Sequence, residues 1–124
     1  MRRALTVDAL VIAALRLQAA RASGAPAEPG FLDRFAAAWD PDLFPTWVAE
    51  RDESHAGVLI AQLVTDLPWP GRATGRRLHV DTLFVPISAD ESRSGPTDSD
   101  ITVALTTAMT TWASDVGLTL AGPS

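Results

Sequence analysis

The sequence predicts one α/β domain of the α+β kind, in which helices cover both faces of a mixed, mostly antiparallel sheet. Three patterns support this fold class: apolar residues at helical spacing near the N-terminus, strand-like segments in the middle, and a long helical pattern before a last short strand. The chain has 124 residues, of which 47% are hydrophobic. It is therefore long enough to form one core, and we expect a single domain over residues 1–124.

Two helices are predicted before the first strand. From Val7 to Ala22, apolar residues recur at helical spacing. Thr6 is positioned to cap this helix, and Asp8 suits the positive end of its dipole. Gly24 and the prolines after it predict a loop. A shorter helix from Phe31 to Trp39 follows, and we interpret its aromatic residues, spaced four apart, as core packing.

Three strands are predicted in the middle of the chain. Residues 46–50 alternate as a strand does, and residues 56–64 are mostly apolar, which indicates a central strand. A polar turn joins them, so an antiparallel hairpin is expected. Residues 67–71 form a loop in this prediction, because prolines flank Trp69 and cannot donate ladder hydrogen bonds. The third strand is predicted over residues 76–86.

The longest helical pattern extends from Ser99 to Val116. Its predicted buried stripe consists of Ile101, Leu105, Ala108 or Met109, and Trp112. Gly117 is placed for a left-handed C-terminal cap, and residues 118–121 form a last short strand. A strand–helix–strand unit implies a parallel pair with a right-handed crossover, which makes the sheet mixed.

Charge and composition exclude several classes of partner. The net charge is −5, the pI is about 4.8, and all ten basic residues are arginines. After residue 77 there are six acidic residues and only Arg93. Because nucleic-acid affinity depends on neutralising phosphates, we expect neither nucleic acid nor an anionic membrane as a partner. Without cysteine, and with only two well-separated histidines, no metal site is expected.

The N-terminal apolar run does not resemble a targeting or spanning segment. Residues 9–15 are apolar, but Asp8 and Arg16 enclose them, and a membrane span needs about 20 apolar residues. An amphipathic helix explains the run better than a signal peptide does. We therefore expect a cytoplasmic protein.

Three segments, in this order, resemble the GNAT superfamily of N-acetyltransferases. Residues 47–50 with 56–58 resemble the hairpin of the family's second and third strands, and residues 80–86 resemble its fourth strand. The third segment resembles the helix that follows the family's coenzyme A loop. The residues that carry this resemblance are Ala104-Leu105, Ala108, Trp112-Ala113 and Gly117. The resemblance implies acetyl-CoA as cofactor, bound in a cleft beside the fourth strand, where Phe84 and Val85 would contact coenzyme A.

The segment before the last helix departs from the family pattern. Members carry R/Q-x-x-G-x-G/A there, whereas residues 97–102 contain neither glycine nor arginine. Asp98 and Asp100 would instead face the pyrophosphate, which a helix N-terminus otherwise attracts. We therefore expect the coenzyme A loop to be disabled. The favoured expectation is that the protein uses no cofactor, and the alternative is that it uses acetyl-CoA.

The end of the sequence departs from the family as well. Members continue with a helix and two more strands, and many use a tyrosine as the acid, but this sequence stops at Ser124 and contains no tyrosine. The expected fold is thus GNAT-like without the family's last helix and strands. Because an unprotected sheet edge favours pairing, a homodimer is expected.

His79 and Asp81 are the candidate catalytic residues. Two residues apart on one strand, they are expected to project to the same face, and the resemblance places that strand beside the cleft. A histidine beside a carboxylate is typical of a general base. The alternative is a solvated polar face, with Leu78, Val80, Thr82 and Phe84 on the opposite side.

Other polar or aromatic residues are candidates for substrate binding or assembly. Arg72 and Arg76 could bind an anionic substrate, and Trp69 could form a pocket wall; the alternatives are a solvated loop and a cover for the core. The last helix has an uncharged hydroxyl face, which we interpret as a subunit interface. This face consists of Thr106, Thr107, Thr110 and Thr111.

Three functions remain open. The favoured hypothesis is that the domain binds or transforms a small metabolite by His79/Asp81 acid–base chemistry without acetyl-CoA. The first alternative is an acetyl-CoA-dependent N-acetyltransferase of a small amine. The second alternative is a non-catalytic dimeric interaction module, because a fold alone does not fix a function.

Overall fold

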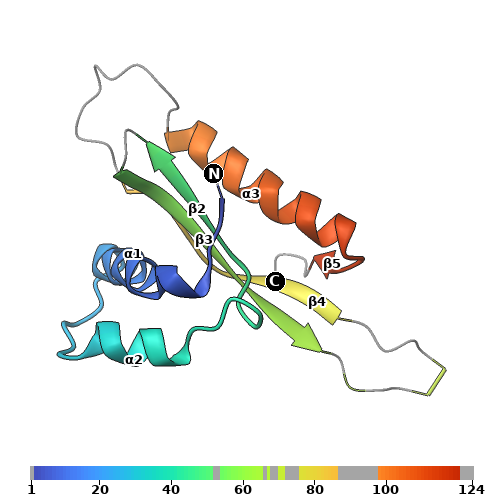
Figure 1. Cartoon of the computed structure of the whole chain (residues 1–124), viewed down its shortest axis with the longest axis horizontal. Coiled ribbons are helices and arrows are strands. Elements are labelled where there is room, and N and C mark those ends of the chain that lie inside the picture. Colours follow the sequence, from blue (N-terminus) through green and yellow to red (C-terminus); the bar gives the residue numbers. More distant parts are fainter. Residues whose placement is uncertain are drawn as a thin grey trace.

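The computed structural model describes residues 2–51, 54–65, 67, 70–71, 76–86 and 98–120. Figure 1 shows the arrangement of the helices and strands. In chain order these are β1 (Arg2–Arg3), the short 3-10 helix η1 (Thr6–Asp8), α1 (Ala9–Ala22), α2 (Phe31–Ala38), β2 (Thr46–Arg51), β3 (Ser54–Thr65), β4 (Arg76–Phe84), α3 (Asp98–Asp115) and β5 (Thr119–Leu120).

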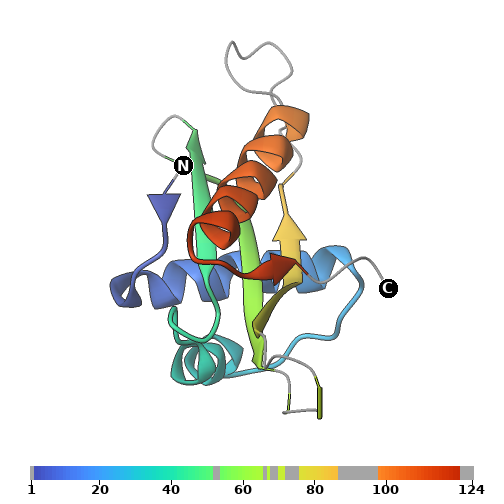
Figure 2. The ribbon, with the colours of Figure 1, turned by 90° about the vertical axis from the view of Figure 1, so that its right-hand side faces the viewer.

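The strands form one five-stranded sheet in the order β1-β2-β3-β4-β5. Neighbouring strands are antiparallel except β4 and β5, which are parallel. The chain passes from β4 to β5 by way of the crossover helix α3. Helices α1 and α2 lie on one side of the sheet and α3 on the other (Figures 1 and 2). The structure thus confirms the predicted mixed, mostly antiparallel sheet with helices on both faces.

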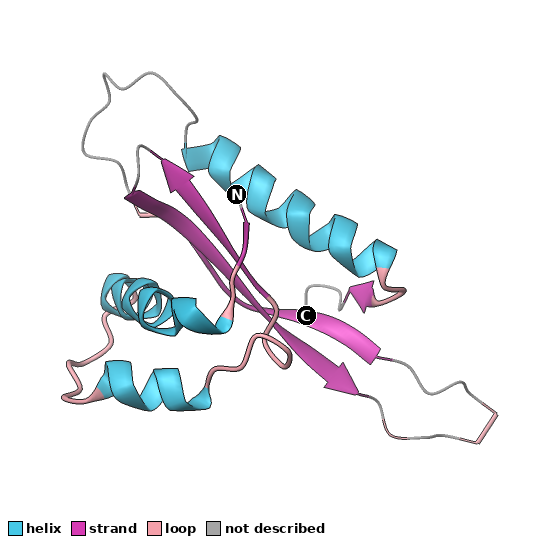
Figure 3. Cartoon of the chain, viewed as in Figure 1, coloured by secondary structure: helices cyan, strands magenta, loops and turns pink. Residues whose placement is uncertain are grey.

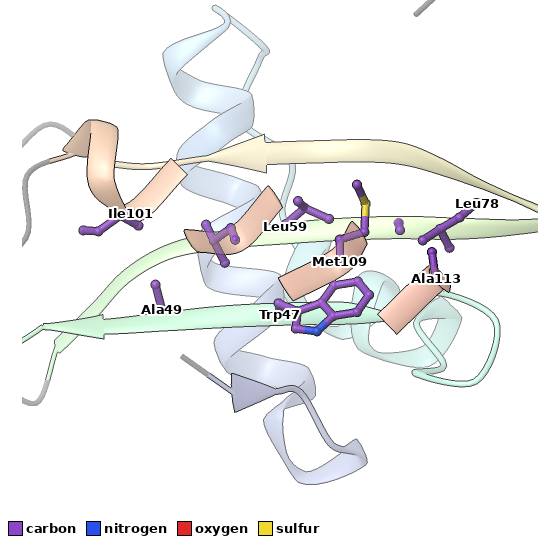
Figure 4. Packing of buried hydrophobic residues seen from close by; sticks show 9 residues of the cluster. Trp47, Ala49, Leu59, Leu78, Ile101, Met109 and Ala113 are labelled. Atoms are coloured by element: carbon purple, nitrogen blue, oxygen red, sulfur yellow. The ribbon is translucent and has the colours of Figure 1, made fainter. Parts of the chain in front are cut away.

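The face of the sheet under α3 carries a closely packed core (Figure 4). Its buried residues are Trp47, Ala49, Leu59, Ala61, Leu78, Ile101, Leu105, Met109 and Ala113. The Trp47 ring meets Trp112 edge-on, with 5.7 Å between ring centroids. The helix approaches the sheet so closely that a Cβ on Gly57 would lie 3.0 Å from Cγ2 of Ile101 and 3.2 Å from Cδ1 of Leu105. Added atoms at this position would therefore force the neighbouring side chains to shift.

The face under α1 and α2 has its own core, with buried residues Ala4, Ile12, Leu15, Trp39, Val48, Val58 and Ile60. Trp39 follows α2 and is buried. Its indole N–H donates to Oγ1 of Thr46 at 3.1 Å, and that hydroxyl donates to the Phe44 carbonyl at 2.7 Å. These bonds satisfy the polar atoms of the buried ring and fix its position.

The N-terminal segment differs most from the prediction. The sequence did not indicate β1, which pairs with β2 through Arg2 and Arg3. The predicted cap Thr6 makes no capping bond; instead the Asp8 carboxylate accepts the Leu5 N–H at 2.8 Å. The same carboxylate accepts two hydrogen bonds from Arg2, at 2.8 and 2.9 Å. Arg2 and the Leu5 N–H together lower the pKa of Asp8 to about 2.

The other helix boundaries are close to the predicted ones (Figure 3). Gly117 ends α3 with φ +74°, as predicted, and the N–H of Leu118 reaches the carbonyl of Ala113 at 2.8 Å. The helix was predicted to begin at Val7, but Val7 lies in η1 and is 89% exposed, whereas Ile12 on α1 is fully buried. Among the described helices, none is both long and apolar enough to cross a membrane.

Candidate functional site

A β-bulge in β4 determines which side chains can form a site. Val80 pairs with Ala61 and Thr82 pairs with Ile60, so Asp81 is an extra residue in β4. Such a bulge breaks the alternation of side chains along a strand. The prediction that Thr82 and Phe84 face away from Asp81 is therefore wrong: the Asp81 and Thr82 side chains both contact α1, and Phe84 packs into the core on that face.

Arg16 connects α1 to this bulge. Its Nη1 donates to Oδ2 of Asp81 and to Oγ1 of Thr82, while Thr82 donates to the same Oδ2 at 2.8 Å. About a third of each side chain of the ion pair is exposed, 35% for Arg16 and 36% for Asp81. An ion pair so accessible to water contributes at most about 1 kcal/mol to folding. Its main effect is to hold the carboxylate in place.

The Arg16–Asp81 pair separates two cavities between the sheet and its helices. One has a volume of about 170 Å³ and a largely aromatic wall; its lining residues are Arg16, Phe35, Ala38, Trp39, Phe44, Ile60 and Asp81. The other is a groove of about 450 Å³ along α1 and the second half of β4. Its lining includes both members of the pair together with Ala19, Thr82 and Phe84. The carboxylate is therefore accessible from both sides.

His79 lies two residues before Asp81 but is not bonded to it. It pairs with Gln62 in the ladder, beside the buried pair of Leu78 and Leu63, so alternation places it on the α1/α2 face. Its side chain is exposed, and among the described residues no hydrogen bond joins it to Asp81. The two predicted catalytic residues thus share a face, whereas the direct partner of Asp81 is Arg16. Their catalytic role stays a prediction.

The remaining candidates are distributed differently. Arg76 is exposed at the start of β4, opposite Thr65 and away from the bulge. Trp69 and Arg72 lie outside the described residues. The Phe84 and Val85 side chains pack against the two cores, one on each face, so any contact that these residues make with a cofactor would come mainly from their backbone.

Beyond its first residues, the outer edge of β4 has no neighbouring strand in the described part of the chain, and we call this segment the open edge. Within the described residues, β5 pairs with β4 only at Arg77 and Leu78, so Val80 to Phe84 have no strand partner on that side. Val85, just after β4, packs against the core that contains Ile101 in the first turn of α3. The end of this open edge therefore lies near the N-terminus of α3 (Figure 1). An open edge offers alternating N–H and C=O groups to a ligand.

Sequence reasoning missed the residues that α1 and the α2–β2 connection contribute. Arg16 lies four residues after the buried Ile12, so the sequence could have placed it at the margin of a buried stripe. No local sequence pattern predicted that Phe44 lines a cavity, because its position depends on how the loop before β2 returns to the sheet. No group of three metal-ligating side chains occurs in the part of the chain that the structure describes.

No family model and no curated protein matches the sequence. Solved structures do match the fold. A predicted acetyltransferase with acetyl-CoA from Clostridium acetobutylicum has a TM-score of 0.75 at 12% identity, covering 99% of this chain and 79% of that one. A ribosomal-protein-alanine N-acetyltransferase from Brucella melitensis biovar Abortus 2308 has 0.64 at 21%, covering 98% and 79%. An aminoglycoside N-acetyltransferase in complex with CoA has 0.59 at 16%, covering 99% and 77%.

These matches confirm the expected fold and correct one functional expectation. The chain has a GNAT-like fold, shared with acetyltransferases of different substrates. The expectation that no cofactor is involved is wrong: one of these neighbours holds acetyl-CoA and another holds CoA. These neighbours give no support to the hypothesis of a cofactor-free function and favour its acetyl-CoA-dependent alternative.

Proposed function

We propose that this chain is an acetyl-CoA-dependent N-acetyltransferase of a small amine, with Asp81 at its centre. The observation that carries the proposal is the position of this carboxylate at the β4 bulge, between two cavities and on a strand whose outer edge is mostly unpaired among the described residues. GNAT-like neighbours that hold acetyl-CoA or CoA support the choice of acyl donor.

The residues of β4 fit the arm of coenzyme A, which carries amide groups. Amides can pair with N–H and C=O groups of Val80 to Phe84 that no described strand pairs on the outer side, as an added strand would. The first turn of α3 fits the phosphates less well, because it begins with Asp98 and Asp100. Like charges there oppose the attraction of the helix N-terminus, so binding should tighten as salt screens them.

Acetyl-CoA would supply the activated acetyl group: the bond from its carbonyl carbon to sulfur breaks as the bond to the amine nitrogen forms, and the departing coenzyme A thiolate takes up the second proton that the nitrogen loses. Asp81 accepts a hydrogen bond from the ammonium form of the amine and removes a proton, which leaves a nucleophilic lone pair. Arg16 and Thr82 keep the carboxylate oriented during this step. The proton then leaves Asp81 for solvent, and we assign to His79, exposed on the same face, the role of a relay through water.

Two measurements test this function. Calorimetric titration of acetyl-CoA should give saturable binding, and silence up to millimolar concentration would contradict the proposal. Turnover with an amine panel is then followed by a thiol-reactive dye. The chain contains no cysteine, so every free thiol detected comes from coenzyme A.

The expected loss of activity is largest for Asp81→Asn, about a hundredfold or more in kcat/KM, because general-base catalysis contributes about 10² to 10⁴. His79→Gln should lower kcat about tenfold and shift the pH profile. The matched control is His55→Gln on the β2–β3 hairpin, an exposed histidine remote from the bulge, which should leave turnover unchanged. Full activity of Asp81→Asn would exclude it as the base.

A further inference from the structure

The smaller cavity has the size of a site for one ring. Its volume is about 170 Å³, and an apolar cavity of about 150 Å³ accommodates benzene. Trp39 and Ile60 in its wall are buried, and Trp39 is held by its bond to Thr46. Half-buried Phe35 and Phe44 complete the aromatic part of the wall. Such a wall would bind an apolar ring without first rearranging its buried members.

The polar groups of this cavity lie at one place only. The Trp39 N–H is already bonded to Thr46, which leaves Arg16 and Asp81 as the charged groups in the lining. Both hydrogen bonds to the Asp81 carboxylate reach Oδ2; within the described residues none reaches Oδ1. A free carboxylate oxygen needs a donor, and a primary ammonium offers three.

We propose that this cavity selects the acceptor, binding the ring of a small arylalkyl primary amine whose ammonium donates to Oδ1 of Asp81. The inference rests on the proposed function, since Asp81 receives the amine there, and it adds the class of substrate. Arg16 holds the other carboxylate oxygen, so the amine approaches the bulge from the cavity side.

The first test compares three probes on the wild-type chain by calorimetric titration without acetyl-CoA. 2-Phenylethylamine should bind at least about tenfold more tightly than propylamine, which has the amine but no ring, because burying a ring is worth about this factor or more. 3-Phenylpropionate has the ring and an anionic end, and should bind more weakly than the amine. Equal affinity for the two amines, or tighter binding of the carboxylate, would overturn the proposal.

The second test fills the cavity. Ala38 on α2 is exposed and lines the cavity, whereas Ala37 is exposed and does not line it. Ala38→Leu should weaken 2-phenylethylamine binding at least about tenfold, and the matched control Ala37→Leu should change it less than about twofold. Equal effects of the two substitutions would overturn the proposal. The comparison of probes on the wild-type chain needs no variant and remains decisive if Ala38→Leu fails to fold.

Acetyl-CoA binding and turnover distinguish a failure of this inference from a failure of the proposed function. In one outcome, the chain binds 2-phenylethylamine, Ala38→Leu abolishes this binding, and acetyl-CoA does not bind. This outcome would support the proposed ring-binding cavity and contradict the proposed acetyltransferase function. Turnover of propylamine and 2-phenylethylamine at equal kcat/KM would support the acetyltransferase and overturn the ring site.

Discussion

The two faces of the sheet are built for different tasks. Under α3, the packing leaves no space for a Cβ on Gly57, and the core continues from Ile101 to Ala113 along the helix. Under α1 and α2, a comparable core is interrupted by two cavities and an exposed ion pair at Asp81. The contrast teaches that the α3 face provides stability while the opposite face tolerates the space and charge that a binding site needs.

The largest effect is expected when a buried side chain under α3 is made smaller. Leu105 is fully buried, so Leu105→Ala should lower the free energy of unfolding by about 3 kcal/mol, within the range of 2–5 for such changes. Val103→Ala on the same helix is the control, since Val103 is 63% exposed, and should cost no more than about 0.5 kcal/mol. Urea unfolding measures both. A loss below 1 kcal/mol for Leu105→Ala would show that this face is not closely packed.

Gain of volume should separate the faces directly. Ala113→Leu adds the same atoms to the buried end of α3 as Ala38→Leu adds beside the aromatic cavity. The first should cost about 1–3 kcal/mol by overpacking, and the second should stay within about 0.5 kcal/mol of wild type because the cavity accepts the side chain. Thermal and urea unfolding provide the measurement. Equal costs would contradict the difference in packing.

Low pH should destabilise the segment before α1, which contains Asp8, before it affects the core under α3. The pKa of Asp8 is about 2 in the folded chain and 3.8 for a free carboxyl, so its contribution is complete above 3.8 and lost as pH falls towards 2. Asp8→Asn should cost about 0.5–1 kcal/mol at pH 7 and show a smaller further loss in acid. Glu28→Gln removes an exposed pair with Arg34 and serves as control. Identical acid dependence of Asp8→Asn and wild type would exclude this role.

One candidate interface for the expected dimer is the solvent side of α3. Thr106 and Thr110 are exposed, and each hydroxyl donates to the carbonyl four residues earlier, at 2.9 and 2.8 Å. With their hydroxyls so bonded, these residues could present methyl groups to a partner. Thr106→Arg should then shift a dimer to a monomer in light scattering, whereas a wild-type monomer would contradict the interface.

Local sequence patterns predicted most elements of the fold because helices and strands leave periodic signals. The stripe of α3 and the cap at Gly117 are examples, since both depend on residues close in sequence. The strand β1 was missed because two residues are too few to show a period, and its existence depends on pairing with Trp47 and Val48.

The site was predicted less completely, for a physical reason. The prediction assumed that side chains alternate between the two faces of the sheet along the whole strand. The bulge at Asp81 shifts this alternation by one residue, and no local feature of the sequence marks that shift. The partner of Asp81 is Arg16, 65 positions away, so the contact follows only from the packing of α1 on the sheet. The structure places Asp81 beside two cavities on the α1/α2 face, while its catalytic role stays a prediction.

The bulge also bears on how this domain could acquire new specificities. In a regular strand, two consecutive residues face opposite sides, so changing a pair would disturb a core. Here Asp81 and Thr82 are adjacent in the sequence and both contact Arg16 on the same side. Two neighbouring codons therefore encode both β4 partners of Arg16, and both of these residues line the groove along α1. A dipeptide library at these positions would sample new ligand chemistries while leaving the packed layer under α3 unchanged.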